Sequence, residues 1–136
     1  MVWQKYLTKA GYKITAPREH VMEIISSSVT PMSPQEIHLR ASRAQQKLGL
    51  VSVYRVLDLF AGLKLVRKVH RSDGCHGYVL SSPGHFHTLI CSQCNRSTEF
   101  KGDEKLEELI ADLELKTGYK IEDHFLQLSG ICPQCQ

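Results

Sequence analysis

Hydrophobic residues in the first half of the chain recur at the three- and four-residue spacing of amphipathic helices. A short helix is expected over residues 3–9, and a second begins at Pro17, because proline is tolerated in the first helical turn. Ser33 and Glu36 have the spacing of a capping box, which starts a third helix that runs toward Lys47. The first half is therefore predicted to open with helices.

A fourth helix is expected after Gly49, with Ser52 as its N-cap. Four of its apolar residues fall at positions i, i+3, i+4 and i+7 and share one inward face: Val53, Val56, Leu57 and Phe60. Tyr54, Arg55 and Asp58 are left on the outward face.

The pattern then changes to the short alternating runs of strands. Residues 63–70 and 77–80 flank a turn around Ser72, Asp73 and Gly74 and predict a basic two-stranded hairpin. Helices followed by such a hairpin are typical of a winged helix-turn-helix, in which the last helix enters the major groove of DNA and the wing lies along its backbone.

Ser, Pro and Gly cluster at residues 81–84 and mark a boundary between two patterned halves. Strands at 86–90 and 97–101 then lead to a helix that is capped by Asp103 and stops at Gly118, and a last strand covers residues 120–129. The predicted fold class is α+β, with a winged helix-turn-helix domain at residues 1–80, a hinge at 81–84 and a small α/β dimerisation domain at 85–136.

The length of 136 residues suits one compact unit or two very small domains. The second half holds only about 50 residues, too few for a generous core, so a metal staple and a partner subunit are both expected. The sequence has no apolar run of membrane-spanning length and no secretory signal at its N-terminus, which predicts a cytoplasmic protein with reduced cysteines.

Charge divides the chain into two unlike parts. Residues 1–71 hold 12 lysines and arginines against 4 aspartates and glutamates, a net charge of +8, whereas residues 72–136 hold 5 against 10, a net charge of −5. A basic half suits a polyanion such as DNA, and an acidic half rich in histidine and cysteine suits metal cations. The asymmetry could also be ordinary solvated surface.

In the winged-helix interpretation, residues of the fourth helix contact bases or phosphates and basic residues around it neutralise phosphates. An equally simple interpretation of Tyr54 is a partly buried aromatic residue, and of any single lysine a solvated charge. The candidate DNA-binding residues are Lys13, Arg18, Ser52, Tyr54, Arg55, Arg67 and Lys68.

Two Cys-x-x-Cys pairs, Cys91 with Cys94 and Cys132 with Cys135, have the spacing of a tetrahedral four-cysteine zinc site. Their separation predicts that the metal fastens the last residues to a strand near the middle of the chain. The alternatives are two disulfides or unrelated cysteines.

Histidines supply a second set of candidate ligands. His85 and His87 alternate along a predicted strand, so their side chains share one face, and Glu107 and His124 could complete a mixed nitrogen and oxygen site. A third set lies near the wing and the hinge: His70, Cys75, His76 and Glu99. Cys75 could instead be an ordinary thiol, and His85 could belong to the hinge set but not to both sets.

The order of a winged helix with Ser-Val-Tyr-Arg-Val-Leu, a His-x-His-x-x-x-Cys-x-x-Cys strand, an acidic helix, a late histidine and a terminal Cys-x-x-Cys resembles the ferric uptake regulator family. The resemblance covers nearly the whole chain. It implies a homodimeric, metal-dependent transcription factor that binds a palindromic operator in double-stranded DNA, with the four paired cysteines as structural zinc ligands. By position it also implies a metal site in the dimerisation half at His85, His87, Glu107 and His124, and a role for His70 and Glu99 in sensing.

Iron and peroxide sensors of that family commonly carry further histidines in the His-rich strand, where this chain has Phe86 and Thr88. The thiolate of Cys75 is a softer ligand that favours zinc over iron(II) or manganese(II). We therefore expect a zinc-responsive repressor of zinc-uptake genes, similar to a zinc uptake regulator, with one structural and one regulatory divalent metal. An iron-, manganese- or peroxide-responsive repressor and a small zinc hydrolase are the alternatives, although no His-Glu-x-x-His motif or Gly-rich phosphate loop points to an enzyme.

Overall fold

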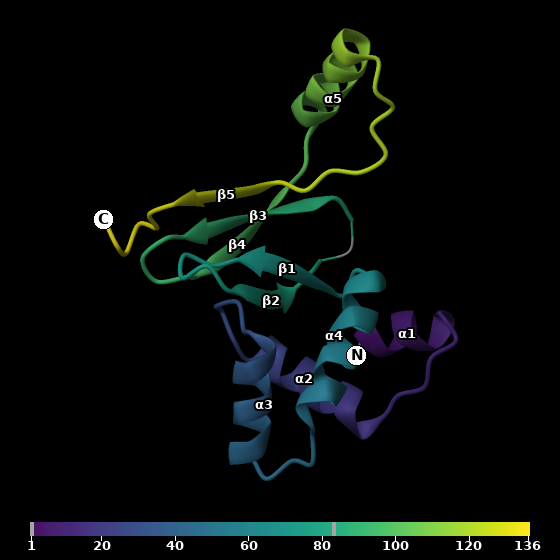
Figure 1. The fold of residues 1–136 in the computed structure, drawn as a ribbon, viewed down its shortest axis with the longest axis vertical. Coiled ribbons are helices and arrows are strands. Elements are labelled where there is room, and N and C mark those ends of the chain that lie inside the picture. Colours follow the sequence, from purple (N-terminus) through teal and green to yellow (C-terminus); the bar gives the residue numbers. More distant parts are fainter. Residues whose placement is uncertain (1, 83) are drawn as a thin grey trace.

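The computed structural model describes residues 2–82 and 84–136, and this part of the chain forms five helices and five strands. The helices are α1 (Val2–Lys9), α2 (Ala16–Ser26), α3 (Pro34–Arg43), α4 (Leu50–Gly62) and α5 (Glu104–Thr117). The strands are β1 (Val66–His70), β2 (His76–Leu80), β3 (Phe86–Cys91), β4 (Ser97–Lys101) and β5 (Gln127–Gly130). Figure 1 shows α1 to α4 at one end, the strands in the middle and α5 at the other end. The predicted α+β class is confirmed.

Several helix ends follow from local chemistry that the sequence already displays. The Ser33 hydroxyl accepts from the backbone N–H of Glu36, and the Glu36 carboxylate accepts from the N–H of Ser33, both at 3.1 Å, which confirms the capping box. Asp103 caps α5 by accepting from the N–H of Lys105 at 3.1 Å, and Gly118 ends that helix at φ 74°.

Two predicted helix boundaries are wrong. Ser52 lies inside α4, which begins at Leu50 with Gly49 as its N-cap and has no side-chain cap. The third helix ends at Arg43 rather than near Lys47, because Gln45 adopts a left-handed backbone with φ 57° that cannot continue a right-handed helix.

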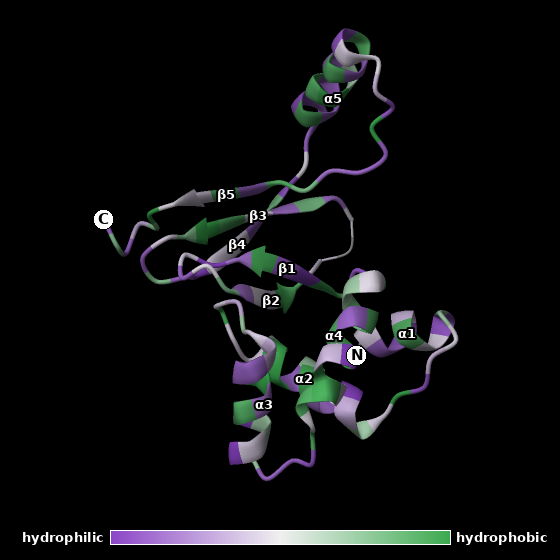
Figure 2. Ribbon diagram, in the orientation of Figure 1, coloured by the Kyte–Doolittle hydropathy of each residue, from purple (hydrophilic) through white to green (hydrophobic). Residues whose placement is uncertain are grey.

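A single apolar core joins α1 to α4. Leu7 from α1, Val21 from α2, Ile37 from α3 and Leu57 and Phe60 from α4 are all fully buried within it. Figure 2 shows hydrophobic positions on these helices interleaved with hydrophilic ones, as expected for amphipathic helices around a shared core. Val66 of β1 and Tyr78 of β2 belong to the same core, so the four helices and the wing are packed around it together.

The strands form two small sheets. In the first, β1 pairs antiparallel with β2, and in the second the order is β4-β3-β5, with β5 parallel to β3. The last strand is much shorter than the predicted 120–129, because only Gln127–Gly130 lies beside Thr88–Cys91 and residues 118–126 form neither helix nor strand.

The β1-β2 hairpin, the predicted wing, contacts both ends of the molecule. A backbone bridge between Met32 and Tyr78 joins it to the helices. On its other side Val69 and Val79 pack with Ile90 of β3 in a second apolar cluster. The wing therefore connects the helical bundle to the β4-β3-β5 sheet.

Helix α5 projects away from the sheets (Figure 1), and none of its side chains is buried. Leu106, Leu109 and Leu113 follow one another at helical spacing, and the latter two are exposed. Throughout the residues that the structure describes, no helix combines the length and the apolar character needed to cross a membrane.

Candidate metal centres and nucleic-acid surface

The two Cys-x-x-Cys pairs meet at the end of the β4-β3-β5 sheet. The parallel pairing of β5 with β3 places Gly130 beside Cys91. The second cysteine pair, which comes directly after β5, therefore lies next to the first pair. One Sγ atom from each of the four cysteines lies within 4.8 Å of all the others. The thiols are free, and the Sγ atoms of Cys94 and Cys132 are 3.8 Å apart, too far for a disulfide bond of about 2.05 Å.

This cluster fits a tetrahedral metal. A Zn–S distance of about 2.3 Å places thiolates about 3.8 Å apart at the corners of a tetrahedron, which matches the separation of Cys94 and Cys132. Backbone N–H groups, first that of Cys94 and then that of Cys132, lower the pKa of Cys91 to about 6. Hydrogen bonding to Cys132 raises the pKa of Cys135 to about 12, so a full set of four thiolates needs a compensating cation.

A second cluster contains His85 directly before β3, His87 near the start of β3 and His124 from the segment before β5. One ring nitrogen of each lies within 4.8 Å of the other two, and the Nε2 atoms of His85 and His124 are 2.7 Å apart. His87 is only 4% exposed, and its Nε2 has no hydrogen-bond partner among the described groups. A buried nitrogen without a partner, facing two other imidazoles, is the arrangement that a metal ligand requires.

The surroundings of this cluster favour metal binding. Burial, followed by the charges of His85, His124 and Arg67, lowers the pKa of His87 and keeps its imidazole in the neutral form that binds metals. Gly102 packs against the rings so closely that a Cβ there would lie 3.0 Å from Nε2 of His87, and a larger residue at this position would have to displace the rings by a few tenths of an ångström.

The structure gathers three of the four residues predicted for this site, and Glu107 on α5 is not within the group.

The ligands predicted for the hinge site do not lie together. His70 and His76 face each other across the wing with ring centroids 4.4 Å apart, Cys75 is exposed in the turn, and Glu99 pairs with Arg67 at 3.4 Å. This ligand set stays a prediction.

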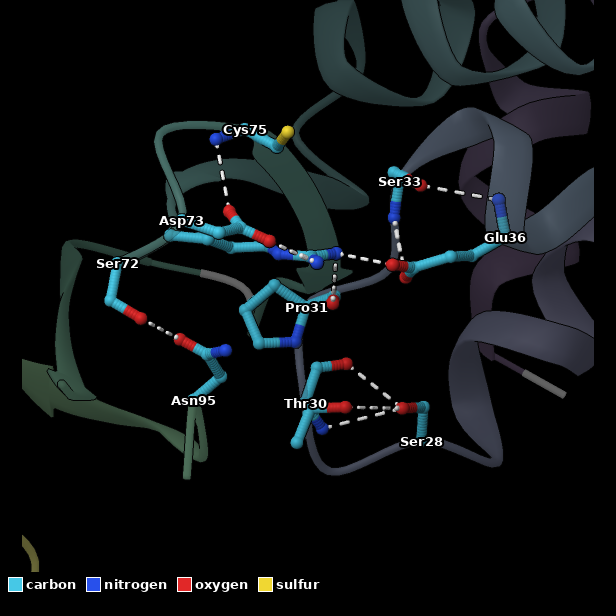
Figure 3. A network of polar contacts seen from close by, with 10 residues as sticks. Ser28, Thr30, Pro31, Ser33, Glu36, Ser72, Asp73, Cys75 and Asn95 are labelled. Carbon is cyan, nitrogen blue, oxygen red and sulfur yellow. Dashed lines mark hydrogen bonds and ion pairs between the residues drawn. The ribbon is translucent and has the colours of Figure 1, made fainter. Parts of the chain in front are cut away.

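A polar network that sequence reasoning did not find surrounds the wing turn (Figure 3). Arg71 donates to Glu36 of the α3 capping box at 2.7 Å and to Asp73 at 2.6 Å. The neighbouring Ser72 donates to Asn95 at 2.9 Å, directly after the first cysteine pair. The sequence showed only the capping-box motif that contains Glu36. It could not show the bond to Arg71, because the two residues lie 35 positions apart.

Candidate DNA contacts lie on the helical bundle and on the wing. Tyr54 and Arg55 are exposed on α4, and the Tyr54 hydroxyl accepts from the side-chain amide of Gln35 on α3 at 2.8 Å. Ser52, on the same helix, is half-buried. Lys13 is exposed beside Arg18, whose guanidinium stacks 5.6 Å from the ring of Tyr12. Lys68 is exposed on β1, whereas its neighbour Arg67 is directed toward Thr88 of β3.

Comparison with known proteins gives consistent matches along the chain. Residues 9–129 match the model of the ferric uptake regulator family. The chain is 36% identical over 132 residues to the ferric uptake regulation protein of Legionella pneumophila, covering 96% of each chain.

Solved structures of similar fold include both iron and zinc regulators. The ferric uptake regulator of Vibrio cholerae is 28% identical, with a TM-score of 0.64 over 95% of this chain and 98% of that one. A zinc uptake regulator in complex with zinc and DNA has a TM-score of 0.76 over 99% of this chain and 95% of that one. At 22% identity the second likeness concerns the fold alone.

Proposed function

Because the chain belongs to the ferric uptake regulator family, it is a metal-responsive DNA-binding regulator, and we propose that it senses zinc and represses zinc-uptake genes. The observation that carries this proposal is the cluster of His85, His87 and His124, which offers three nitrogen ligands and no gathered carboxylate. Imidazole nitrogen suits zinc, whereas manganese prefers oxygen ligands, and binding at a given site is generally stronger for zinc than for iron(II) or manganese(II).

The neighbouring positions on β3 support the same choice. Phe86 offers no ligand atom, and the Thr88 hydroxyl already accepts a hydrogen bond from Arg67 at 3.0 Å. The two histidines, His85 and His87, are therefore the ligands that this segment offers to the histidine cluster, and the site stays rich in nitrogen. The four cysteines form a separate, structural zinc site in this proposal, because a closed set of thiolates leaves no position open for exchange.

DNA recognition in this proposal uses the bundle and the wing. Helix α4 presents Tyr54 and Arg55 to the major groove, and Lys13, Arg18 and Lys68 neutralise phosphates. Two copies of the chain pair through the apolar stripe of α5, so that a two-fold dimer meets a palindromic operator.

The experiment that tests the proposal is recovery of genomic fragments by the purified protein with free zinc, iron(II) or manganese(II) buffered separately. We expect specific fragments with zinc, and none with zinc after His87→Ala. The matched control is His38→Ala, which changes a histidine of α3 outside both clusters. Recovery that needs iron or manganese instead would refute the zinc assignment and leave the family assignment intact.

Iron is the second candidate, and a specific observation favours it. The relative from Legionella pneumophila, at 36% identity, is a ferric uptake regulation protein. The iron(II) condition of the same experiment decides between the two metals.

The predicted hinge set of His70, Cys75, His76 and Glu99 is a further part of the proposal. A metal there would have to take Glu99 from its ion pair with Arg67. Cys75→Ala should abolish the zinc response and leave a folded dimer if that set senses the metal, and an unchanged response would remove it from the mechanism.

A further inference from the structure

Arg67 lies on β1 next to the exposed Lys68, yet its side chain is directed away from solvent. The side chain is 17% exposed, and its guanidinium donates from Nη1 to the Thr88 hydroxyl at 3.0 Å and from Nη2 to the Ser81 hydroxyl at 3.1 Å. Thr88 is itself buried in the middle of β3. One arginine of the wing is thus bound to the connecting segment and to the central strand of the other sheet.

Glu99 completes this arrangement from β4. It is opposite Thr88 in the antiparallel pairing of β3 with β4, and its Oε1 lies 3.4 Å from Nη2 of Arg67. The same oxygen accepts the backbone N–H of Ser82 at 2.9 Å. The carboxylate therefore binds both the arginine and the segment that leads from the wing to β3.

Other contacts lie along the same junction. The side-chain amide of Gln127 on β5 pairs with the backbone of His70 on β1, accepting at 2.9 Å and donating at 2.7 Å. Val69 and Val79 of the wing pack against Ile90 beside it. Side-chain and backbone groups thus hold the wing to the β4-β3-β5 sheet at several points.

From these contacts we infer that Arg67 is a positioning residue rather than a phosphate contact: with Glu99 it forms a clamp that fixes the wing, and through the wing the DNA-reading helices, on the metal-binding sheet. Arginine suits this role because its planar fork of donors can bind Thr88, Ser81 and Glu99 together, which the point charge of a lysine cannot do. Arg67 and the three histidines line the same open cavity of about 760 Å³.

The first test needs no DNA and so does not depend on the proposed function. Amide hydrogen exchange is measured on the His87→Ala variant, which lacks one ligand of the histidine cluster, and on the wild-type protein, each with Arg67→Lys or with the matched control Lys68→Arg. We expect Arg67→Lys to speed exchange at the Ser82 amide and along β1 and β3 by about tenfold, since bonds to a charged partner are lost. If the amides of the Arg67→Lys variant exchange no faster than those of the Lys68→Arg variant, the inferred clamp is refuted.

The second test rests on the proposed function, because it measures operator affinity against salt concentration. A residue that only neutralises a phosphate tolerates replacement of arginine by lysine. Its removal makes the fall of the logarithm of the DNA-binding constant with the logarithm of salt concentration less steep by about 1. We expect Arg67→Lys and Arg67→Met to weaken binding about tenfold with an unchanged slope, because they loosen the junction. Lys68→Met should lower the slope. A lowered slope for Arg67→Met with normal hydrogen exchange would make Arg67 a phosphate contact.

Glu99→Met gives the sharpest contrast. Removing a negative charge beside a phosphate contact would strengthen DNA binding, whereas loss of the clamp weakens it. We expect weaker binding, and an effect in the Arg67→Met, Glu99→Met double variant no larger than in either single variant, as for two groups of one interaction. Stronger binding by Glu99→Met, or additive effects, would refute the inference. If the wild-type protein binds no DNA but Arg67→Lys still speeds amide exchange, the proposed function is wrong and the clamp is supported.

Discussion

The helical bundle and the metal-binding half are stabilised by different means. In the bundle, α1 to α4 share one core of fully buried side chains such as Ile25, Ile37 and Phe60. In the other half, α5 buries no side chain, and the four cysteines and three histidines gather at opposite parts of one three-stranded sheet. Apolar burial is sufficient for the first half, whereas in the proposed function bound zinc and a second copy of the chain supply what the second half lacks.

The largest effect is expected from Cys91→Ser. A structural zinc site in a small domain contributes about 10–16 kcal/mol of apparent free energy, so its loss should unfold β3 to β5 and leave α1 to α4 helical. Zinc content by mass spectrometry and amide hydrogen exchange measure this difference. Gln93→Ala, at an exposed residue between the two cysteines of the first pair, is the control. A Cys91→Ser protein that kept its zinc and its protected strands would contradict the structural role.

The second prediction concerns a substitution in the core of the helical bundle. Phe60→Ala should lower the free energy of unfolding by about 3–5 kcal/mol, because it opens a cavity among fully buried neighbours. Denaturant titration followed by circular dichroism measures the loss, with Val51→Ala on the exposed face of α4 as the control. Zinc content should be unchanged in both variants, and a parallel loss of zinc would show that the two halves unfold as one unit.

A third variant separates the partner surface from both metal sites. Placing glutamate at Leu109 and Leu113 should raise the dissociation constant of the dimer by at least about tenfold, since charge would have to be buried in the paired stripe. Sedimentation equilibrium measures the constant. Leu115→Glu, at a residue 86% exposed on the same helix, is the matched control. Equal constants for the two proteins would place the dimer surface elsewhere.

The smallest effect concerns the capping box of α3. Ser33→Ala removes an N-cap and should destabilise the bundle by about 1 kcal/mol without altering metal content or the dimer. Thermal unfolding detects a change of this size, and Ser42→Ala, inside α3, provides a comparison at the same helix. A loss as large as that of Phe60→Ala would mean that the neighbouring Arg71 network depends on the cap.

Much of this architecture could be predicted from the sequence, because caps and spacing are local signals. The capping box of Ser33 and Glu36, the cap at Asp103 and the stop at Gly118 are confirmed. The cap at Ser52 was wrong, since Gly49 offers an extended N-cap three positions earlier and the apolar pattern cannot distinguish these starts.

Part of each metal cluster could also be predicted from the sequence, because some of its ligands are close together in the chain. The alternation of His85 and His87 along a strand places both rings on one face, and a Cys-x-x-Cys pair brings its two thiols together in one turn. The partners that complete each set lie far along the chain, and the structure brings in His124 but not Glu107.

The junction could not be predicted, because nothing local distinguishes Arg67 from Lys68. Both are basic residues in a basic strand, and both were predicted to contact phosphates. Which of them faces Glu99, 32 positions away, depends on how the wing packs against β3. Long-range pairing of charges is decided by tertiary packing rather than by pattern.

The parallel pairing of β5 with β3 also sets an order in time. On the ribosome the four helices and the wing are made first and share one core, whereas Cys132 and Cys135 are made only after α5 and β5. A growing chain can therefore fold its first half before its four-cysteine site is complete. In the proposed function, each molecule passes through an early interval in which its DNA-binding half is folded and its structural zinc has not yet been bound.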